Sequence, residues 1–273
     1  MQIGGLQKVS LIDWPGKIAA VVFLIGCNFR CPFCQNPELV ETKQYSVSAI
    51  LPRISQIDFF TFLESREKLL EGVSVTGGEP TINPDLPEFL EKIKKIGFSV
   101  KLDTNASNPK MLEELISKKM IDYFAVDIKA SPKNYLKTIG LFYYPERSRR
   151  SPANARNSLN KLRDSSVALL FQNDILKNIE KSLDIIQKSG IPFEFRTTAV
   201  PGIIDEKEMN KIKKWLKNLG VLEKAKIYAI QQFRSEKTLD KSFEKIKPYS
   251  EKKLESFAGI IKPEVKRVEI RGI

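Results

Sequence analysis

Residues 26–34 read Gly-Cys-Asn-Phe-Arg-Cys-Pro-Phe-Cys and contain all three cysteines of the 273-residue chain, Cys27, Cys31 and Cys34. Thiolates are the ligands that iron–sulfur clusters use. Spacings of three and two intervening residues allow one loop to hold three corners of a cubane cluster. The chain has no fourth cysteine and no histidine. The fourth iron would therefore be open to a ligand from outside the protein.

Two other interpretations of these cysteines are weaker. Structural zinc prefers four nitrogen or sulfur ligands, and this chain would need a carboxylate to complete such a set. Three inert, buried cysteines are the second alternative, but the clustering beside Pro32 and Phe33 in a loop after a strand disfavours it. An odd number of cysteines within eight residues is not a disulfide framework. We therefore expect a [4Fe–4S] cluster on Cys27, Cys31 and Cys34.

Working outward from this loop, the chain alternates apolar runs with helical patterns. Each short apolar run is typical of a buried strand. Strand, helix, glycine, strand, repeated along the chain, predicts parallel βα units that curl into a barrel or an open doubly wound sheet. The predicted strands are residues 18–26, 73–76, 98–103, 123–128, 193–200, 227–233 and, at the C-terminus, 265–270.

Glycine and proline mark the ends of the predicted helices. Gly97, Gly190 and Gly220 each follow an apolar stripe at helical spacing, which is typical of a helix C-terminus. Asn108-Pro109 has the sequence of an N-cap followed by a first-turn proline. We expect one domain over residues 1–273.

Residues 141–174 interrupt this rhythm. They are rich in Ser, Asn and Arg and fall where a βα repeat needs only a short connection. We interpret the segment as a partly disordered insertion on the barrel surface. A functional lid or partner-binding arm is the alternative.

Composition restricts the setting of the protein. No run approaches the ~18 apolar residues of a membrane span, and the N-terminus lacks a signal-peptide pattern. We expect a cytoplasmic protein with no membrane contact. The net charge is +12, but the lysines are scattered along the chain. Binding to nucleic acid is therefore disfavoured, and a basic face for anionic substrates or a protein partner suits the charge better.

The pattern Cys27-x-x-x-Cys31-x-Phe33-Cys34 resembles the signature of the radical S-adenosylmethionine (radical SAM) superfamily. The resemblance implies a partial (β/α)6-type TIM barrel. It implies that the open iron of a [4Fe–4S] cluster chelates S-adenosylmethionine. It also implies that the reduced cluster cleaves the sulfonium to give a 5′-deoxyadenosyl radical, which abstracts a hydrogen atom.

Residues 76–80, Thr-Gly-Gly-Glu-Pro, resemble the family's GGEP motif. Two glycines let a backbone approach a ligand closely, although a tight turn would use them equally well. The resemblance places Gly77, Gly78 and Glu79 in the S-adenosylmethionine pocket, with Phe33 from the cysteine loop.

Polar residues at the ends of later predicted strands match the same pocket, namely Asp103, Asn105, Asp127, Lys129 and Arg196. Lys129 and Arg196 suit the methionine carboxylate, Arg196 through the fork geometry of its guanidinium. Asp127 suits a polar or cationic partner. Salt bridges between strand ends are the alternative use of Asp103, Lys129 and Arg196.

Residues 10–17 (SLIDWPGK) and 36–39 (NPEL) resemble segments of the glycyl-radical-enzyme activases. Within that group, residues 231–234 (QQFR) and 268–273 (VEIRGI) resemble the activating proteins of anaerobic ribonucleoside-triphosphate reductase. The implied task is to abstract a hydrogen from a glycine Cα of that reductase. A flavodoxin- or ferredoxin-type electron donor is implied as well. A radical SAM enzyme acting on a small molecule, similar to 7-carboxy-7-deazaguanine synthase, is the first alternative. A non-catalytic iron–sulfur or zinc protein is the second.

Overall fold

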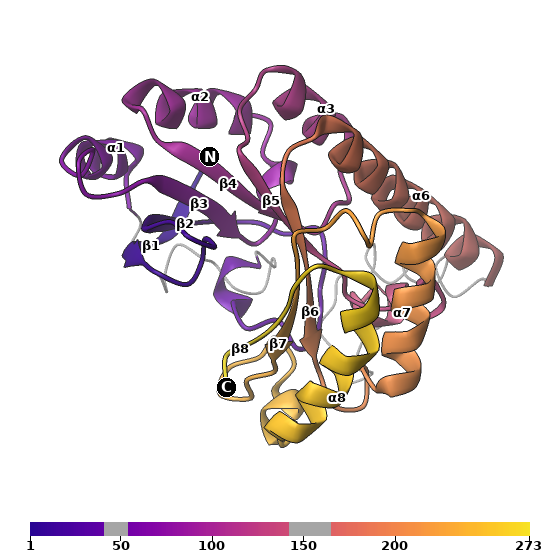
Figure 1. Cartoon of the computed structure of the whole chain (residues 1–273). Coiled ribbons are helices and arrows are strands. Elements are labelled where there is room, and N and C mark those ends of the chain that lie inside the picture. Colours follow the sequence, from indigo (N-terminus) through magenta and orange to yellow (C-terminus); the bar gives the residue numbers. More distant parts are fainter. Residues whose placement is uncertain (41–53, 142–164) are drawn as a thin grey trace, which may run out of the picture.

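The computed structural model describes residues 1–40, 54–141 and 165–273. Eight strands form one curved sheet in which neighbours in sequence are neighbours in space (Figure 1). The strands are β1 Ile3–Ser10, β2 Ala19–Leu24, β3 Gly72–Gly77, β4 Ser99–Thr104, β5 Tyr123–Asp127, β6 Phe193–Ala199, β7 Ile227–Gln232 and β8 Val268–Arg271. All seven strands from β2 to β8 run parallel. The prediction of a partial barrel built from parallel βα units is confirmed.

Helices connect the parallel strands and cover the outside of the sheet (Figure 1). They are α1 Gln56–Glu64, α2 Leu86–Ile96, α3 Pro109–Ser117, α4 Tyr135–Thr138, α6 Ser165–Ser189, α7 Glu206–Asn218 and α8 Glu251–Ile261. Gly97 ends α2 in the left-handed conformation, with φ 108°. The side chain of Asn108 accepts a hydrogen bond from the Met111 amide at the start of α3. Both predicted helix boundaries are therefore confirmed, and each has its expected cause.

Strand β1 is absent from the predicted strands. Its sequence, IGGLQKVS, has no continuous apolar run and alternates poorly. It pairs antiparallel with β2 at the edge of the sheet, where only one side needs a partner. An edge strand with one pairing partner needs less apolar surface than a central strand, so the apolar-run criterion missed it.

The predicted insertion over residues 141–174 is described only in part. Helix α6 begins at Ser165, so the last ten residues of that segment are helical. Residues 142–164 lie outside the described ranges, and the insertion itself stays a prediction.

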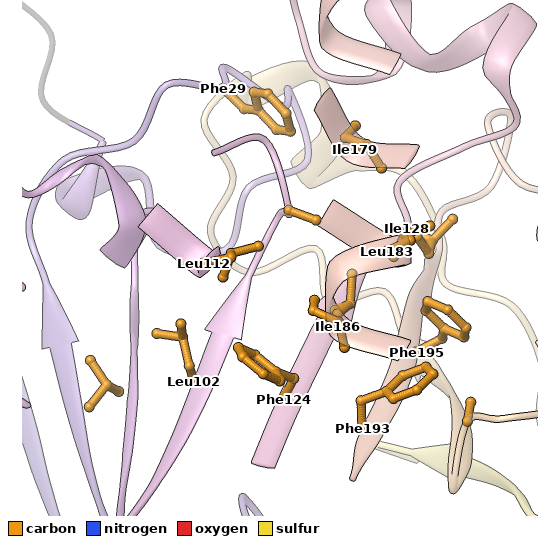
Figure 2. Close-up of a cluster of buried hydrophobic side chains, with 14 of the residues drawn as sticks. Phe29, Leu102, Leu112, Phe124, Ile128, Ile179, Leu183, Ile186, Phe193 and Phe195 are labelled. Atoms are coloured by element: carbon orange, nitrogen blue, oxygen red, sulfur yellow. The ribbon is translucent and has the colours of Figure 1, made fainter. Parts of the chain in front are cut away.

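The two faces of the sheet differ in chemistry. The outer face is apolar and packs on the helices, and Figure 2 shows this contact where α6 lies over β5 and β6. The buried side chains there are Ile179, Leu183 and Ile186 of α6 and Phe124, Phe193 and Phe195 of the strands. Burying each such side chain stabilises the fold by about 1.5–3 kcal/mol. The inner face instead carries ionisable residues, which form the site described below.

Candidate active site at the carboxyl ends of the strands

The cysteine loop leaves the carboxyl end of β2 and is fixed by several other loops of the barrel. Main-chain hydrogen bonds run from Glu79 N to Gly26 O (2.7 Å), from Arg30 N to Ile139 O (2.8 Å) and from Asp240 N to Pro32 O (2.9 Å). Phe29, labelled in Figure 2, is 3% exposed and joins the main hydrophobic core. The loop is therefore held in place by the fold itself.

Gly77 and Gly78 bring the end of β3 against this loop. A Cβ at Gly77, where φ is +129°, would lie 2.2 Å from the Leu24 carbonyl oxygen. A Cβ at Gly78 would lie 1.9 Å from the Gly26 carbonyl oxygen and 3.2 Å from Cβ of Cys27. Real Cβ atoms do not come this close to backbone, so only glycine fits at either position. The structure thus adds a reason for the Gly-Gly pair, which is close packing against the cysteine loop.

The three cysteines form no disulfide. Burial raises the pKa of Cys27 and of Cys31 to about 12 and raises that of Cys34 as well. Lys129 opposes this effect at all three thiols, since its positive charge lowers their pKa. A ligating thiol must lose its proton. The charge of Lys129 lowers the thiol pKa values only in part, so the positive charge of bound iron would have to lower them further.

The donor set suits a cluster better than one ion. Among the described residues, no three His, Cys, Asp or Glu side chains are arranged to hold a single metal ion. In a cubane cluster each cysteine binds a different iron, so its thiolates need not converge on one point. Three thiols on one fixed loop, with a lysine beside them, therefore fit the expected [4Fe–4S] cluster.

A chain of alternating charges crosses the inner face next to this loop. Arg196 Nη1 donates to Asp103 Oδ2 (2.8 Å), and Arg196 Nε donates to Asp127 Oδ1 (2.9 Å). Lys129 Nζ donates to the other oxygen of Asp127 at 3.0 Å. At the far end Lys101, whose side chain is 1% exposed, pairs with Asp103. The salt bridges offered as the alternative use of these residues are therefore present.

The charges of this chain set one another's pKa values. Burial alone would raise the pKa of Asp103 and of Asp127. Arg196 together with a lysine outweighs burial at each carboxyl and holds both pKa values below their usual range. In return, Asp127 outweighs burial at Lys129 and raises the pKa of its ammonium. Both carboxyls, Arg196 and Lys129 are therefore charged at neutral pH.

Glu79 and Asn105 connect the loops that follow β2, β3 and β4. Glu79 is 1% exposed, and its carboxylate accepts hydrogen bonds from the Asn105 amide (2.6 Å) and the Thr104 hydroxyl (2.8 Å). Asn105 Nδ2 donates to Asn28 Oδ1 of the cysteine loop at 2.9 Å. Both residues thus connect the end of β4 to the loops before it.

Not every expected site residue lies in the same environment. Phe33 is 5% exposed and packs against Phe243, with 6.4 Å between ring centroids.

Lys101 was not among the predicted site residues, although the alternation Val-Lys-Leu-Asp in residues 100–103 was a signal for a charged inner face. Tyr135 was also missed; its hydroxyl lies 3.5 Å from the Lys129 amide nitrogen. Nothing in its sequence context marks it as a neighbour of the site.

Residues 10–17 lie at the opposite end of the barrel from the cysteines. Ser10 pairs with Ala19 at the start of β2, and Lys17 Nζ donates to the Ser99 hydroxyl at the start of β4. Trp14 is 3% exposed and packs with Ala19 and Tyr123. This segment therefore closes the base of the barrel.

Known proteins are similar to this chain in sequence and in fold. Residues 21–216 match the radical SAM superfamily. A Methanocaldococcus jannaschii protein, named as a proposed glycyl-radical enzyme activating enzyme, is 32% identical over 99% of this chain and 96% of that protein. A 7-carboxy-7-deazaguanine synthase of Methanopyrus kandleri is 31% identical over 42% of this chain and 50% of its own. A pyruvate formate-lyase-activating enzyme of Clostridium pasteurianum is 29% identical over 47% of this chain and 52% of its own.

A solved structure shares the fold. The crystal structure of Streptococcus suis SuiB bound to S-adenosylmethionine has a TM-score of 0.58 at 14% identity, covering 92% of this chain and 50% of SuiB. Within the described residues, no helix is long and apolar enough to cross a membrane. The extent of the family match and the near full-length relative agree with the cysteine loop and the barrel. The chain belongs to the radical SAM superfamily and is an enzyme that uses a [4Fe–4S] cluster and S-adenosylmethionine.

Proposed function

We propose that this enzyme generates a glycyl radical on an anaerobic ribonucleoside-triphosphate reductase. The observation that carries the proposal is the 32% identity to a proposed glycyl-radical enzyme activating enzyme over 99% of this chain. The reductase in particular is favoured by the resemblance of residues 231–234 and 268–273, and residues 10–17 and 36–39 resemble the activases in general. The flavodoxin- or ferredoxin-type electron donor and the cytoplasmic location stay predictions.

We assign Cys27, Cys31 and Cys34 to the cluster. When bound, the reduced cluster and S-adenosylmethionine supply a carbon-centred radical that removes one hydrogen atom from the substrate. Lys129 is the residue that we assign to the methionine carboxylate. It carries a full positive charge, and that charge acts on all three thiols.

The other strand-end residues take supporting roles in this proposal. Gly77 and Gly78 let the β3 turn lie against the cysteine loop, and their carbonyls are the groups that we assign to the ammonium of S-adenosylmethionine. Nε and Nη1 of Arg196 donate hydrogen bonds to Asp127 and Asp103 respectively. We therefore assign it to holding these carboxylates rather than to direct contact with the methionine carboxylate. Glu79 and Asn105 hold the loops between them, and Phe33 anchors the cysteine loop in the core.

The test follows the hydrogen atom. The reconstituted enzyme, S-adenosylmethionine and a one-electron reductant are incubated without oxygen with an anaerobic reductase whose glycines carry deuterium at Cα. We expect a glycyl radical signal on the reductase and one deuterium in the 5′-deoxyadenosine product. Two matched controls should give no radical: the Cys31→Ala enzyme, and a reductase whose radical-bearing glycine is replaced by alanine.

A small-molecule substrate is the second candidate, and it rests on the partial match to 7-carboxy-7-deazaguanine synthase. That candidate predicts 5′-deoxyadenosine with the deazaguanine synthase's substrate and no radical on any glycyl-radical enzyme. Such a result would reject the activase proposal while leaving the radical SAM assignment in place.

A further inference from the structure

Glu208 is a buried acid on an outer helix. It lies in the first turn of α7, a helix otherwise rich in exposed lysines, yet it is 3% exposed. Its carboxylate oxygens face the loop that follows β5. Oε1 accepts from the Ser131 backbone amide and Oε2 accepts from Asn134 Nδ2, both at 2.8 Å.

The carboxylate is charged in this position. Burial opposes its ionisation, but hydrogen bonds from Ser131, Lys211 and Asn134 outweigh burial and hold the pKa of Glu208 below its usual range. The side chain of Lys211 is 54% exposed, and its Nζ lies 3.3 Å from Oε2 of Glu208. The two short bonds from Ser131 and Asn134 are therefore charge-assisted, which makes them stronger than bonds between neutral groups.

The segment that Glu208 holds is the one that carries Lys129. Only Ala130 separates Lys129 from Ser131. On the upstream side, the Ile128 amide donates to the Arg196 carbonyl (2.8 Å), and the Ile128 carbonyl accepts from the Thr197 hydroxyl (3.0 Å). The backbone of Lys129 is thus fixed from β6 before it and from α7 after it.

A second contact ties α7 to the same segment. Trp215 of α7 packs edge-on against Tyr135, with 6.0 Å between ring centroids. The Tyr135 hydroxyl lies 3.5 Å from both the Lys129 amide nitrogen and the Asp127 carbonyl oxygen. These long contacts fix Lys129 weakly. The two short bonds to Glu208 are the stronger of the restraints from α7.

We infer that Glu208 is a positioning residue which, by holding the Ser131 amide, places the Lys129 ammonium for S-adenosylmethionine. The inference rests on the proposed role of Lys129 and concerns cofactor affinity, whatever the substrate of the radical. The effect is indirect, since Glu208 binds the backbone two residues beyond Lys129. At metal sites, removing a hydrogen-bonding group that orients a ligating residue typically costs about tenfold to a hundredfold in affinity or activity, and we expect an effect near the lower end for Lys129.

The experiment measures the dissociation constant of S-adenosylmethionine for the reconstituted, unreduced enzyme, by equilibrium dialysis without turnover. We expect Glu208→Ala to weaken binding about tenfold, with iron content unchanged. Glu208→Gln keeps an acceptor for the Ser131 amide and should bind close to wild-type affinity. Glu206→Ala is the matched control, since it removes an acid of the same helix turn that pairs with Lys253 rather than with the loop after β5, and it should leave the affinity unchanged.

A double-mutant cycle separates positioning from general damage. If Glu208 acts through Lys129, then Glu208→Ala should weaken binding no further once Lys129 is replaced by methionine. Hydrogen exchange of residues 127–134 in the cofactor-free protein supplies a second readout, and it should speed up in Glu208→Ala but not in Glu208→Gln.

Each failure has a distinct meaning. If Lys129→Met leaves the affinity unchanged, the proposed role of Lys129 fails, and the inference fails with it. If Lys129→Met weakens binding but Glu208→Ala does not, or if the two losses multiply, only the positioning role is overturned.

Discussion

The close approach of Gly78 to the cysteine loop gives a quantitative prediction for Gly78→Ala. The added Cβ would lie 1.9 Å from the Gly26 carbonyl oxygen. Since an ordinary C···O contact is about 3.3 Å, the two backbones must separate by about 1.4 Å. The Glu79 N to Gly26 O hydrogen bond lies at the same place and would break. Overpacking costs about 1–3 kcal/mol, and the lost bond adds about 1 kcal/mol.

This displacement falls directly on Cys27, which we assign to the cluster. Cys27 follows Gly26, and its own Cβ lies 3.2 Å from the added atom. Metal–ligand distances tolerate deviations of about 0.2 Å, far less than the required movement. We therefore expect Gly78→Ala to fold with reduced stability and to retain less than half of the wild-type iron after anaerobic reconstitution.

The assay is iron and acid-labile sulfide per folded protein, collected after size-exclusion chromatography, with thermal unfolding measured in parallel. Gly259→Ala is the matched control. Gly259 lies in α8, and nothing would lie within 4 Å of its Cβ. This control should keep all its iron and gain about 0.5–1 kcal/mol from the better helix former. Wild-type iron content in folded Gly78→Ala would refute the steric argument.

Three other substitutions test the rest of the structure. Arg196→Gln leaves Asp103 and Asp127 without their shared cation, and breaking such a buried pair should cost about 3–5 kcal/mol in urea unfolding at pH 7. Because Arg196 lowers both carboxyl pKa values in the folded protein, their stabilisation is complete above the unfolded value of about 4. This stabilisation is lost as the pH falls through the lower pKa values of the folded protein. Acid should therefore reduce the difference in unfolding free energy between wild type and Arg196→Gln. A difference that stays constant from pH 7 to 3 would contradict this account. Trp14→Ala should cost about 3–5 kcal/mol, yet the folded fraction should bind normal iron, because Trp14 closes the opposite end of the barrel; selective iron loss would argue against that separation. Asn108→Ala removes the side-chain cap of α3 and should lower stability by about 1 kcal/mol in thermal unfolding, leaving S-adenosylmethionine affinity unchanged.

Local sequence predicted those features of the fold that have local causes. The parallel strands carry apolar side chains on the face that the helices cover, and their boundaries agree with the sequence to within three residues. Gly97 and Asn108 mark helix ends because a left-handed residue and a side-chain cap are local requirements. Strand β1 was not predicted because its pairing with β2, and not its own composition, makes it a strand.

The placement of polar residues at strand ends was equally predictable, but their pairing was not. Arg196 reaches Asp103 across the intervening strand β5, where Ala125 lies beside Asp103 in the register. That contact depends on strand register and on a small neighbouring side chain, and neither shows in the spacing of Asp103 and Arg196 along the chain. Glu208 looks like one more charge on a surface helix. Only the docking of α7 beside Ser131 buries it.

These pairings determine the net charge of the salt-bridge chain beside the cysteine loop. The chain of salt bridges has three cations, Lys101, Arg196 and Lys129, and two carboxylates, Asp103 and Asp127. It therefore carries one excess positive charge. Lys101 is buried with Asp103 at one end, and Arg196 is shared between both carboxylates. Lys129 ends the chain on the side where its charge acts on the cysteines. Three thiolates would place negative charge beside Lys129, and a carboxylate bound at the open iron would add more. Replacing Lys129 with methionine should then weaken the binding of S-adenosylmethionine to the reconstituted enzyme, whereas loss of Arg196 should first weaken the fold.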